Sequence, residues 1–382
     1  MALFSGRKQA RAENALRQAE LVAAGPAPWR AGREARRAVE HCAAVFGPGA
    51  EATARARALV ARALRSAGDF DGAEAELRSA LAAVEPDGAS DGTLRGELAV
   101  VLELGGRAAE AEQEARRVLA AGHGTWETRQ WLAISVGSSG RHREAAELFA
   151  EAAGHARGLP DGETYSCKLR SDRLAQLVLL GRFAEVDEEA VELRARAARL
   201  SGPTGLLVPV AVDNNRALGL VLRGRPGEAE RLLLGGLRAV GGRGRVAVVL
   251  QINLSRTLLA LGRVAEAADA VAAARMLTGG VQALPAHDRT ALAHAEAAVL
   301  LARDELAAAE RQARTTLPHL APAHHRALEL RTLLGTAELR RGAGSDTLTA
   351  VLADWRTHFG PDHHGAAAAR AALADAGGRP RA

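Results

Sequence analysis

Aromatic residues are scarce in this sequence, and cysteines are almost absent. Phe, Trp and Tyr make up 3% of the 382 residues although 48% are hydrophobic, so Ala, Leu and Val must form most of any core. Small aliphatic side chains suit closely packed helices better than a β-sandwich, which favours β-branched and aromatic residues. The two cysteines, Cys42 and Cys167, lie far apart and outside any CxxC pair, so no disulfide framework is expected.

Lysine is also nearly missing, and arginine carries the positive charge instead. Only Lys8 and Lys168 are lysines among 50 basic residues, which 45 acidic residues balance to a net charge of +5. Positive and negative side chains mix along most helical segments, as in residues 310–314. A nucleic-acid-binding face concentrates positive charge instead. We therefore expect no direct nucleic-acid partner.

No long apolar segment is present. The longest nearly uninterrupted one, LLVPVAV at 206–212, is far shorter than the ~20 residues that a membrane-spanning helix needs. The first residues, MALFSGRKQARAEN, contain no apolar stretch of the kind found in secretory signals. The sequence therefore favours a soluble cytoplasmic protein without a membrane partner.

The common catalytic and cofactor motifs are missing as well. A phosphate-binding P-loop needs Gly-Lys-Ser/Thr, but neither lysine follows a glycine, and no histidine precedes a glutamate as in His-Glu-x-x-His. GGRGRVA at 241–247 lacks the third glycine of a dinucleotide fingerprint. VGSSG at 136–140 lies where a helix-to-helix turn is expected, so Ser139 is a poor nucleophile candidate. We predict no catalytic residue, no cofactor and no enzymatic activity.

What the sequence does contain is a repeated phrase: a Gly, then Arg or Asp, then an Ala a few residues later. Clear copies follow one another at intervals of 34 to 43 residues, and weaker copies occur at 303–312 and around Gly342. The clear copies are GDFDGAEAEL (68–77), GRAAEAEQEA (106–115), GRHREAAELF (140–149), GRFAEVDEEA (181–190), GRPGEAERLL (224–233) and GRVAEAADAV (262–271).

Each phrase lies between two segments whose apolar residues recur every three or four positions, which predicts a pair of amphipathic helices. The Gly suits the turn because it tolerates a positive φ just past a helix end. A single pair cannot bury its apolar face, so about eight pairs must stack as an all-α solenoid. We expect one continuous array in three parts. These are a divergent pair in 1–50 (helices at 7–24 and 29–46), repeats in 51–341, and a degenerate repeat with a capping helix (364–376) in 342–382.

This pattern resembles the tetratricopeptide repeat, whose unit is 34 residues. GRHREAAELFAEA (140–152) matches its turn, and DNNRALGL (213–220) and INLSRTLLALG (252–262) match its first helix. Most units here are longer, like those of kinesin light chains and of the sensor arms of actinobacterial signalling ATPases, in which Gly-Pro-Asp-His opens a unit. GPDHHGAAAAR (360–370) begins in the same way. The resemblance implies a right-handed α-solenoid of eight to nine helix pairs with a C-terminal capping helix, and a role in binding other proteins.

In this repeat class the first helix of each pair lines the concave groove, so one repeated register should face a ligand. Counting back nine residues from each turn gives Leu59, Glu97, Trp131, Asp172, Asn215, Asn253 and His294. Counting back six gives Arg62 and Arg256, and counting back thirteen gives Arg55, Glu127 and Lys168. All of these except Leu59, together with Gln130 and Asn214, are the predicted binding residues.

The asparagines resemble the backbone clamp of kinesin-light-chain-like repeats. An amide offers both a donor and an acceptor to a peptide group, so a ladder of asparagines can hold an extended chain whatever its sequence. The alternative is that Asn215 and Asn253 only satisfy backbone groups between helices. Likewise, Trp131 could fill a gap left by alanines, and Leu59 is expected in the core.

Half of the twelve histidines lie near the C-terminus, in two loops between repeats: His319, His324, His325, His358, His363 and His364. They could bind a metal or form a pH-sensitive edge, since histidine has an ordinary pKa of about 6.5. Only Asp362 adds a local carboxylate, so the favoured interpretation is exposed loop residues, and no metal is predicted. Asp362 is expected to cap the helix that follows.

The sequence as a whole favours a non-catalytic interaction protein that binds a protein or peptide in its concave groove, as a scaffold or a regulatory sensor module. One alternative is a transcription or signalling regulator that acts through a partner, because no separate DNA-binding domain is present. The other is a metal-dependent protein that uses the C-terminal histidines.

Overall fold

The computed structural model describes residues 2–25, 27–279 and 284–377, with the side chains of 2–5, 203–204 and 376–377 left out. Every regular element in this part of the chain is a helix. Two are short 3₁₀ turns, at Pro28–Ala31 and Leu317–His319. The α-helices are α1 (Ala2–Ala23), α2 (Gly32–Phe46), α3 (Glu51–Ser66), α4 (Phe70–Leu81), α5 (Ala89–Gly105), α6 (Ala108–Ala120), α7 (Trp126–Ser138), α8 (His142–Ala156), α9 (Gly162–Leu179), α10 (Phe183–Ala197), α11 (Gly202–Leu222), α12 (Pro226–Ala239), α13 (Gly244–Ala260), α14 (Val264–Thr278), α15 (Ala286–Ala302), α16 (Leu306–Thr316), α17 (His325–Arg340), α18 (Asp346–Phe359) and α19 (His364–Gly377).

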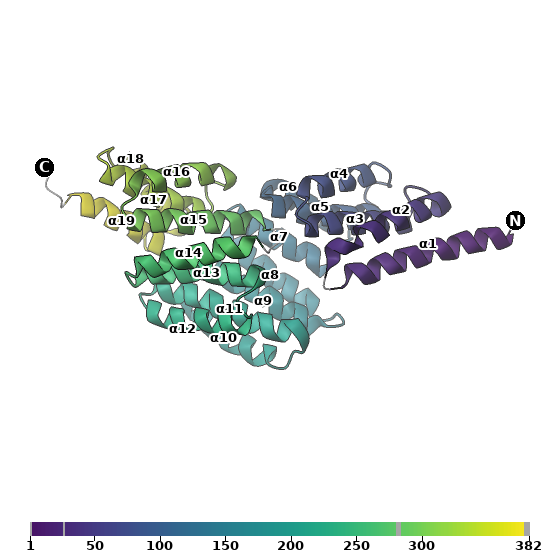
Figure 1. Ribbon diagram of the computed structural model, residues 1–382, viewed down its shortest axis with the longest axis horizontal. Coiled ribbons are helices and arrows are strands. Elements are labelled where there is room, and N and C mark those ends of the chain that lie inside the picture. The colour runs from purple at the N-terminus through teal and green to yellow at the C-terminus, as the bar shows by residue number, and fades with distance from the viewer. Residues whose placement is uncertain (1, 26, 280–283, 378–382) are drawn as a thin grey trace. The chain divides into compact units, whose positions relative to one another are not determined.

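The helices follow one another as pairs, which confirms the predicted all-α solenoid (Figure 1). Along the described chain α1 to α18 form nine successive pairs, and α19 is the single capping helix. Every predicted Gly-Arg or Gly-Asp turn lies between the first and the second helix of a pair, and the rest of each phrase begins the second helix. We call the odd-numbered helices first helices and the even-numbered ones second helices.

The turns between paired helices have the left-handed backbone that the glycines predicted. Gly106 has a φ of 95° and Gly262 a φ of 73°. After α13, the N–H of Gly262 donates to the carbonyl of Leu259 at 3.0 Å, and the N–H of Arg263 donates to the carbonyl of Leu258 at 2.9 Å. These bonds satisfy carbonyls that a helix end otherwise leaves free. The turn is therefore set by local sequence.

One turn differs from the predicted register by one residue. In the degenerate copy at 303–312 the left-handed position is Asp304, with a φ of 61°, and not Arg303. Aspartate can adopt this conformation because its short polar side chain bonds locally. Counting back nine from Asp304 leads to Ala295, so His294 is not the equivalent of Asn253 that the sequence register suggested.

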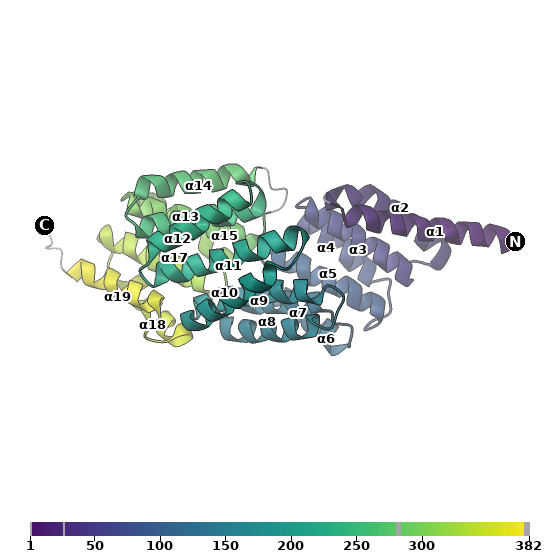
Figure 2. The same ribbon diagram turned by 90° about the horizontal axis from the view of Figure 1, so that it is seen from below.

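First helices also contact one another, and this gives the stack its curvature. From α9 to α19, each first helix packs on the first helix of the next pair, whereas second helices pack mainly on their neighbours in chain order (Figures 1 and 2). Helices that approach closely on one side of a stack must line its concave side. The first helices of this segment therefore form an inner face.

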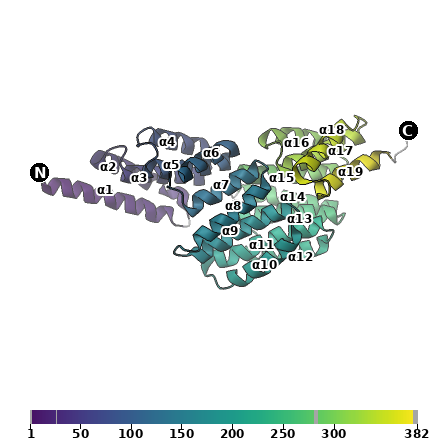
Figure 3. The same ribbon diagram turned by 180° about the vertical axis from the view of Figure 1, so that it is seen from behind.

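The chain divides into two compact units. The first unit comprises residues 1–135 and 282–285, and the second comprises residues 136–281 and 286–382. Figure 3 shows the second unit from α8 onward as a continuous run of packed helices. The predicted boundaries after residues 50 and 341 separate kinds of repeat and do not coincide with this division; they stay predictions.

Small aliphatic side chains fill the cores, as the composition required. In the second unit Leu174, Leu177 and Leu193 are fully buried among alanines and valines. In the first unit Leu77, Leu94 and Leu98 play the same part. Cys42 and Cys167 are buried free thiols.

The recurring arginine after each turn glycine has a structural role. Arg107 pairs with Glu110 in its own second helix and, at 2.6 Å, with Glu74 in the second helix before it. Arg263 contacts Glu266 and Glu230 in the same arrangement. Arg107 and Arg263 thus link consecutive second helices, whereas Arg182 and Arg225 pair within their own second helix, with Glu185 and Glu228.

Helix α11 passes a length and composition test for a membrane span, over Gly205–Leu222, with 33% of that window buried. The window contains LLVPVAV (206–212), the longest nearly uninterrupted apolar segment of the sequence. The window contains the polar residues 213–216, and α11 packs on α9, α10, α12 and α13 as the first helix of a pair. Core helices of soluble proteins can have the same length and composition.

Candidate functional site: the inner face of the second unit

Within the second unit, the last repeats reach back to the first one. His363 at the start of α19 lies 2.8 Å, by its Nε2, from the carbonyl of Leu179 at the end of α9. The rings of His324 and His325, at the start of α17, lie 5.8 Å and 5.2 Å from the ring of His142 on α8. The inner face of this unit is therefore closed by contacts between residues as much as 184 positions apart.

The two closing loops share one motif, Pro-x-His-His, at 322–325 and 361–364. The Nδ1 of His324 accepts from the N–H of Arg326 at 3.2 Å, and the Nδ1 of His363 accepts from the N–H of Gly365 at 3.2 Å. These imidazoles satisfy N–H groups that a helix start leaves free. The expectation that Asp362 caps α19 was wrong: its side chain is exposed, and His363 does the capping.

The expectation of exposed loop histidines holds for only part of the set. His319 and His358 are exposed, but His324, His325 and His363 are 7–8% exposed. Spacing along the chain could not show this burial, because it depends on the return of the array to α8 and α9. We call the five residues that meet there the closure cluster: His142, His324, His325, Phe359 and His363.

Aromatic packing extends the closure cluster toward α18. The ring of His363 lies 4.7 Å from that of Phe359 and stacks on Trp355 at 5.0 Å. Phe359 lies 5.5 Å from His142. Trp355 is fully buried, and its Nε1–H donates to Thr332 Oγ1 at 3.1 Å. The cluster is thus anchored in the core of the last repeat.

The imidazoles of the closure cluster are uncharged at neutral pH. Burial lowers the pKa of His142 to about 4 and lowers the pKa values of His324 and His325 well below the ordinary value. The Nδ1 of His142 lies 2.8 Å from Gln176 Oε1, an acceptor, so Nδ1 carries the proton. Among the described residues, no group of three or more His, Cys, Asp or Glu side chains is arranged to hold a metal ion.

Charged side chains lie on the inner face beside the closure cluster. Arg256 on α13 pairs with Glu329 on α17, and His294 Nε2 on α15 lies 3.9 Å from Glu329 Oε2. Burial alone would raise the pKa of Glu329, but Arg256 and the other neighbouring cationic groups lower it to about 2. Their side chains remain 29%, 15% and 13% exposed for Arg256, His294 and Glu329. The inner face is therefore polar and still accessible.

Both asparagines of the predicted ladder, Asn215 and Asn253, already donate hydrogen bonds to other groups of the protein. Asn215 Nδ2 donates to Ser171 O on α9 at 3.0 Å, and Asn253 Nδ2 donates to Asn214 Oδ1 on α11 at 2.7 Å. These bonds tie successive first helices together, which is the alternative that the sequence left open. Their role as a ligand clamp stays a prediction.

The second unit contains two further predicted groove residues on α9. Lys168 is exposed and Asp172 is half-buried. In the first unit, Arg62 pairs with Glu97 on the next first helix at 2.6 Å, and Arg55 pairs with Glu20. Of the predicted groove residues on α7, Glu127 is exposed, Trp131 is half-buried and Gln130 is buried. Leu59 is buried, as expected for a core residue. The structure thus uses several groove charges to hold first helices to one another.

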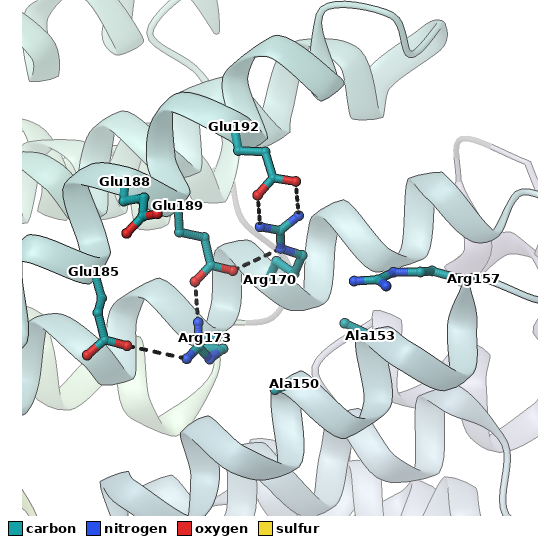
Figure 4. A pocket seen from close by; sticks show the side chains of 9 residues that line it. All are labelled: Ala150, Ala153, Arg157, Arg170, Arg173, Glu185, Glu188, Glu189 and Glu192. Atoms are coloured by element: carbon teal, nitrogen blue, oxygen red, sulfur yellow. Dashed lines mark hydrogen bonds and ion pairs between the residues drawn. The ribbon is translucent and has the colours of Figure 1, made fainter.

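Apart from the inner face, a hollow of about 380 Å³ is lined by residues of α8, α9 and α10 (Figure 4). Arg170 on its floor bonds Glu189 at 2.9 Å and also Glu192, and Arg173 pairs with Glu189 and Glu185. The Arg–Glu contact recurs as Arg57–Glu76 and Arg95–Glu114. Sequence reasoning missed this pair, although its signal is an Arg eleven residues before and a Glu eight residues after the turn glycine.

Comparison with known proteins finds similarity in structure only. Neither a family description nor a curated protein matches the sequence. The apo form of the quorum sensor NprR from B. thuringiensis is similar over 90% of this chain and 98% of its own, with 10% identity and a TM-score of 0.56. A Rap protein complexed with Competence and Sporulation Factor is similar over 85% of this chain and 97% of its own (13% identity, TM-score 0.52).

A tetratricopeptide repeat protein from Parabacteroides merdae is also similar, over 74% of this chain and 98% of its own, with 15% identity and a TM-score of 0.46. Identities this low speak for the fold alone. With the helix pairs, the turn glycines and the stacked first helices, the chain has the tetratricopeptide-repeat-like fold that its sequence predicted.

Proposed function

We propose that this chain is a non-catalytic binding protein whose inner face in the second unit holds a segment of peptide. The observation that carries the proposal is the accessible polar lining formed by Arg256, His294 and Glu329 on three consecutive first helices. Polar groups left partly exposed inside a curved stack are suited to a polar chain. The closure cluster keeps these helices in one arrangement, which lowers the entropy lost on binding.

Two similar structures support a binding or sensing role. NprR is a quorum sensor, and the Rap protein was seen in complex with Competence and Sporulation Factor. We carry from them the idea that this fold can bind or sense a ligand, and not the identity or the position of that ligand. The missing catalytic motifs support a scaffold or sensor over an enzyme.

The proposal is tested by selecting displayed random peptides on the immobilised full-length chain and measuring their dissociation constants. Asn253→Ala should weaken the selected peptides roughly fivefold, because losing one net hydrogen bond corresponds to about 1 kcal/mol. Arg263→Ala, on the outer side of the same helix pair, is the matched control and should leave binding unchanged.

Two results would contradict the proposal. One is a selection that enriches no peptide above an unrelated helical protein. The other is a set of enriched peptides that Asn253→Ala and Arg263→Ala affect equally. Thermal melting of each variant ensures that the comparison is made on folded protein.

A further inference from the structure

One guanidinium on the inner face has no carboxylate partner. Arg326, at the start of α17, donates from Nη1 to His287 O at 3.0 Å and to Thr290 Oγ1 at 3.3 Å, both on α15. No Asp or Glu of the described chain forms an ion pair with it. By contrast, Arg245 and Arg256 in the same neighbourhood are each paired with a carboxylate.

The nearest carboxylates are already engaged. Glu329, one turn further along α17, pairs with Arg256, and Asp288 on α15 pairs with Arg245. The histidines around Arg326 add no negative charge, and burial keeps His294, His324 and His325 neutral by lowering their pKa values. Of Arg245, Arg256 and Arg326, the first two pair with these two carboxylates, so the positive charge of Arg326 is left without a partner.

This charge lies in an unfavourable environment. Burial lowers the pKa of Arg326 below its ordinary value, with only a partial counter-effect from Glu329 and Asp288. A charge removed from water is costly unless a partner of opposite charge replaces the solvent. Its bonds to a carbonyl and a hydroxyl satisfy hydrogen-bonding geometry but do not neutralise it.

Arg326 nevertheless remains open to a ligand. Its side chain is partly exposed, and of its five N–H donors only those on Nη1 have a protein acceptor among the described residues. A guanidinium presents its remaining N–H groups as a fork that fits two oxygens of one carboxylate.

We propose that Arg326 is the anchor for a carboxylate of the ligand held on the inner face, which rests on the proposed function of that face. A singly charged carboxylate would balance the one positive charge left over. A doubly charged phosphate would exceed that charge and would approach Glu329, which is ionised. The ligand class that follows is a peptide with a free carboxylate, from its C-terminus or an acidic side chain.

The test uses two small probes that differ only in charge, N-acetylglycine and N-acetylglycinamide, added to the full-length chain at equal ionic strength balanced with sodium chloride. We expect the acid to raise Tm by a few degrees and the amide to leave it unchanged, because a ligand that binds only the folded state stabilises that state. Equal effects of acid and amide would overturn the proposal. So would a larger effect of inorganic phosphate than of N-acetylglycine.

Variants assign the effect to one residue. Arg326→Met should abolish the response to N-acetylglycine, and Arg326→Lys, which keeps the charge but not the fork, should reduce it. Arg356→Met, an exposed arginine on α18, is the matched control and should respond like the wild type. A full response in Arg326→Met would refute the assignment.

A purely structural role for Arg326 predicts something different. In that case Arg326→Met would be less stable than the wild type without any probe, because α15 and α17 would lose their link. An anion anchor predicts that this variant is at least as stable, since an unneutralised charge is gone. If Arg326→Met does not fold, the Lys variant and the two probes still decide the question. The probe experiment needs no peptide, so it can fail while selected peptides bind, and the two proposals stay distinguishable.

Discussion

At the scale of single residues, glycines inside the helices do two different things. Gly335 in α17 lies so close to α18 that an added Cβ would meet Leu348 Cγ at 2.8 Å and its backbone N at 3.0 Å. Gly154 in α8 has no such neighbour within 4 Å. Both look alike in the sequence, because a missing side chain gives no sign of what lies opposite it.

The two positions should therefore respond oppositely to alanine. We expect Gly335→Ala to lower the free energy of unfolding by about 1–3 kcal/mol through overpacking. Gly154→Ala should raise it by up to about 1 kcal/mol, because alanine restricts the unfolded chain and favours helix. Urea unfolding followed by circular dichroism measures both. Two losses, or two gains, would show that the helix packing around Gly335 is described wrongly.

At the scale of elements, the turn phrase was the most informative part of the sequence. Its glycine predicted where first helices end. Its arginine was taken as part of the repeat pattern without an assigned contact. In the structure Arg107 pairs with Glu74 of the preceding repeat as well as with Glu110. That contact was not visible in one unit, because it joins two.

The link between Arg107 and Glu74 should be weak. Both side chains are near the surface, Arg107 being 42% exposed, and exposed ion pairs contribute at most about 1 kcal/mol. A double-mutant cycle with Arg107→Ala and Glu74→Ala should give a coupling below that value, and adding salt should shrink it further. A coupling that salt leaves unchanged would mean that this contact is shielded from solvent.

At the scale of the whole molecule, the main structural feature is the set of contacts that join the last repeats of the second unit to α8 and α9. His142 faces Gln176, the two histidines of α17, His363 and Phe359, with Arg326 nearby. None of these groups except the histidines can take up a proton at mildly acidic pH. The cluster therefore links the pH to the stability of the closed arrangement.

Acid should destabilise this unit before its carboxylates titrate. The unfolded chain binds protons at histidine below about pH 6.5, whereas the pKa of folded His142 is about 4. The unfolded state thus binds more protons between these values, so the free energy of unfolding falls as the pH drops from about 6.5 toward 4. Urea midpoints across this range, with hydrogen exchange at 139–146 and 321–329, measure the effect.

His142→Phe keeps an aromatic ring in the cluster and removes one titrating group, so stability should depend less steeply on pH. His319→Gln is the matched control, because His319 is exposed on its loop. Identical slopes in the wild type and His142→Phe would show that burial of this imidazole does not control the acid response.

Local sequence was enough to specify the helix pairs, their stacking as a solenoid and most of their turns, whereas the turn at Asp304 differed by one residue from the predicted register. Helical periodicity and turn glycines act within a few residues, so one unit contains all the information needed. Tertiary structure alone decided which side chains meet: His363 with Leu179, Arg256 with Glu329, and Arg326 with no acid at all. These outcomes depend on how far each repeat rotates on the one before it, and that angle comes from packing summed over many repeats.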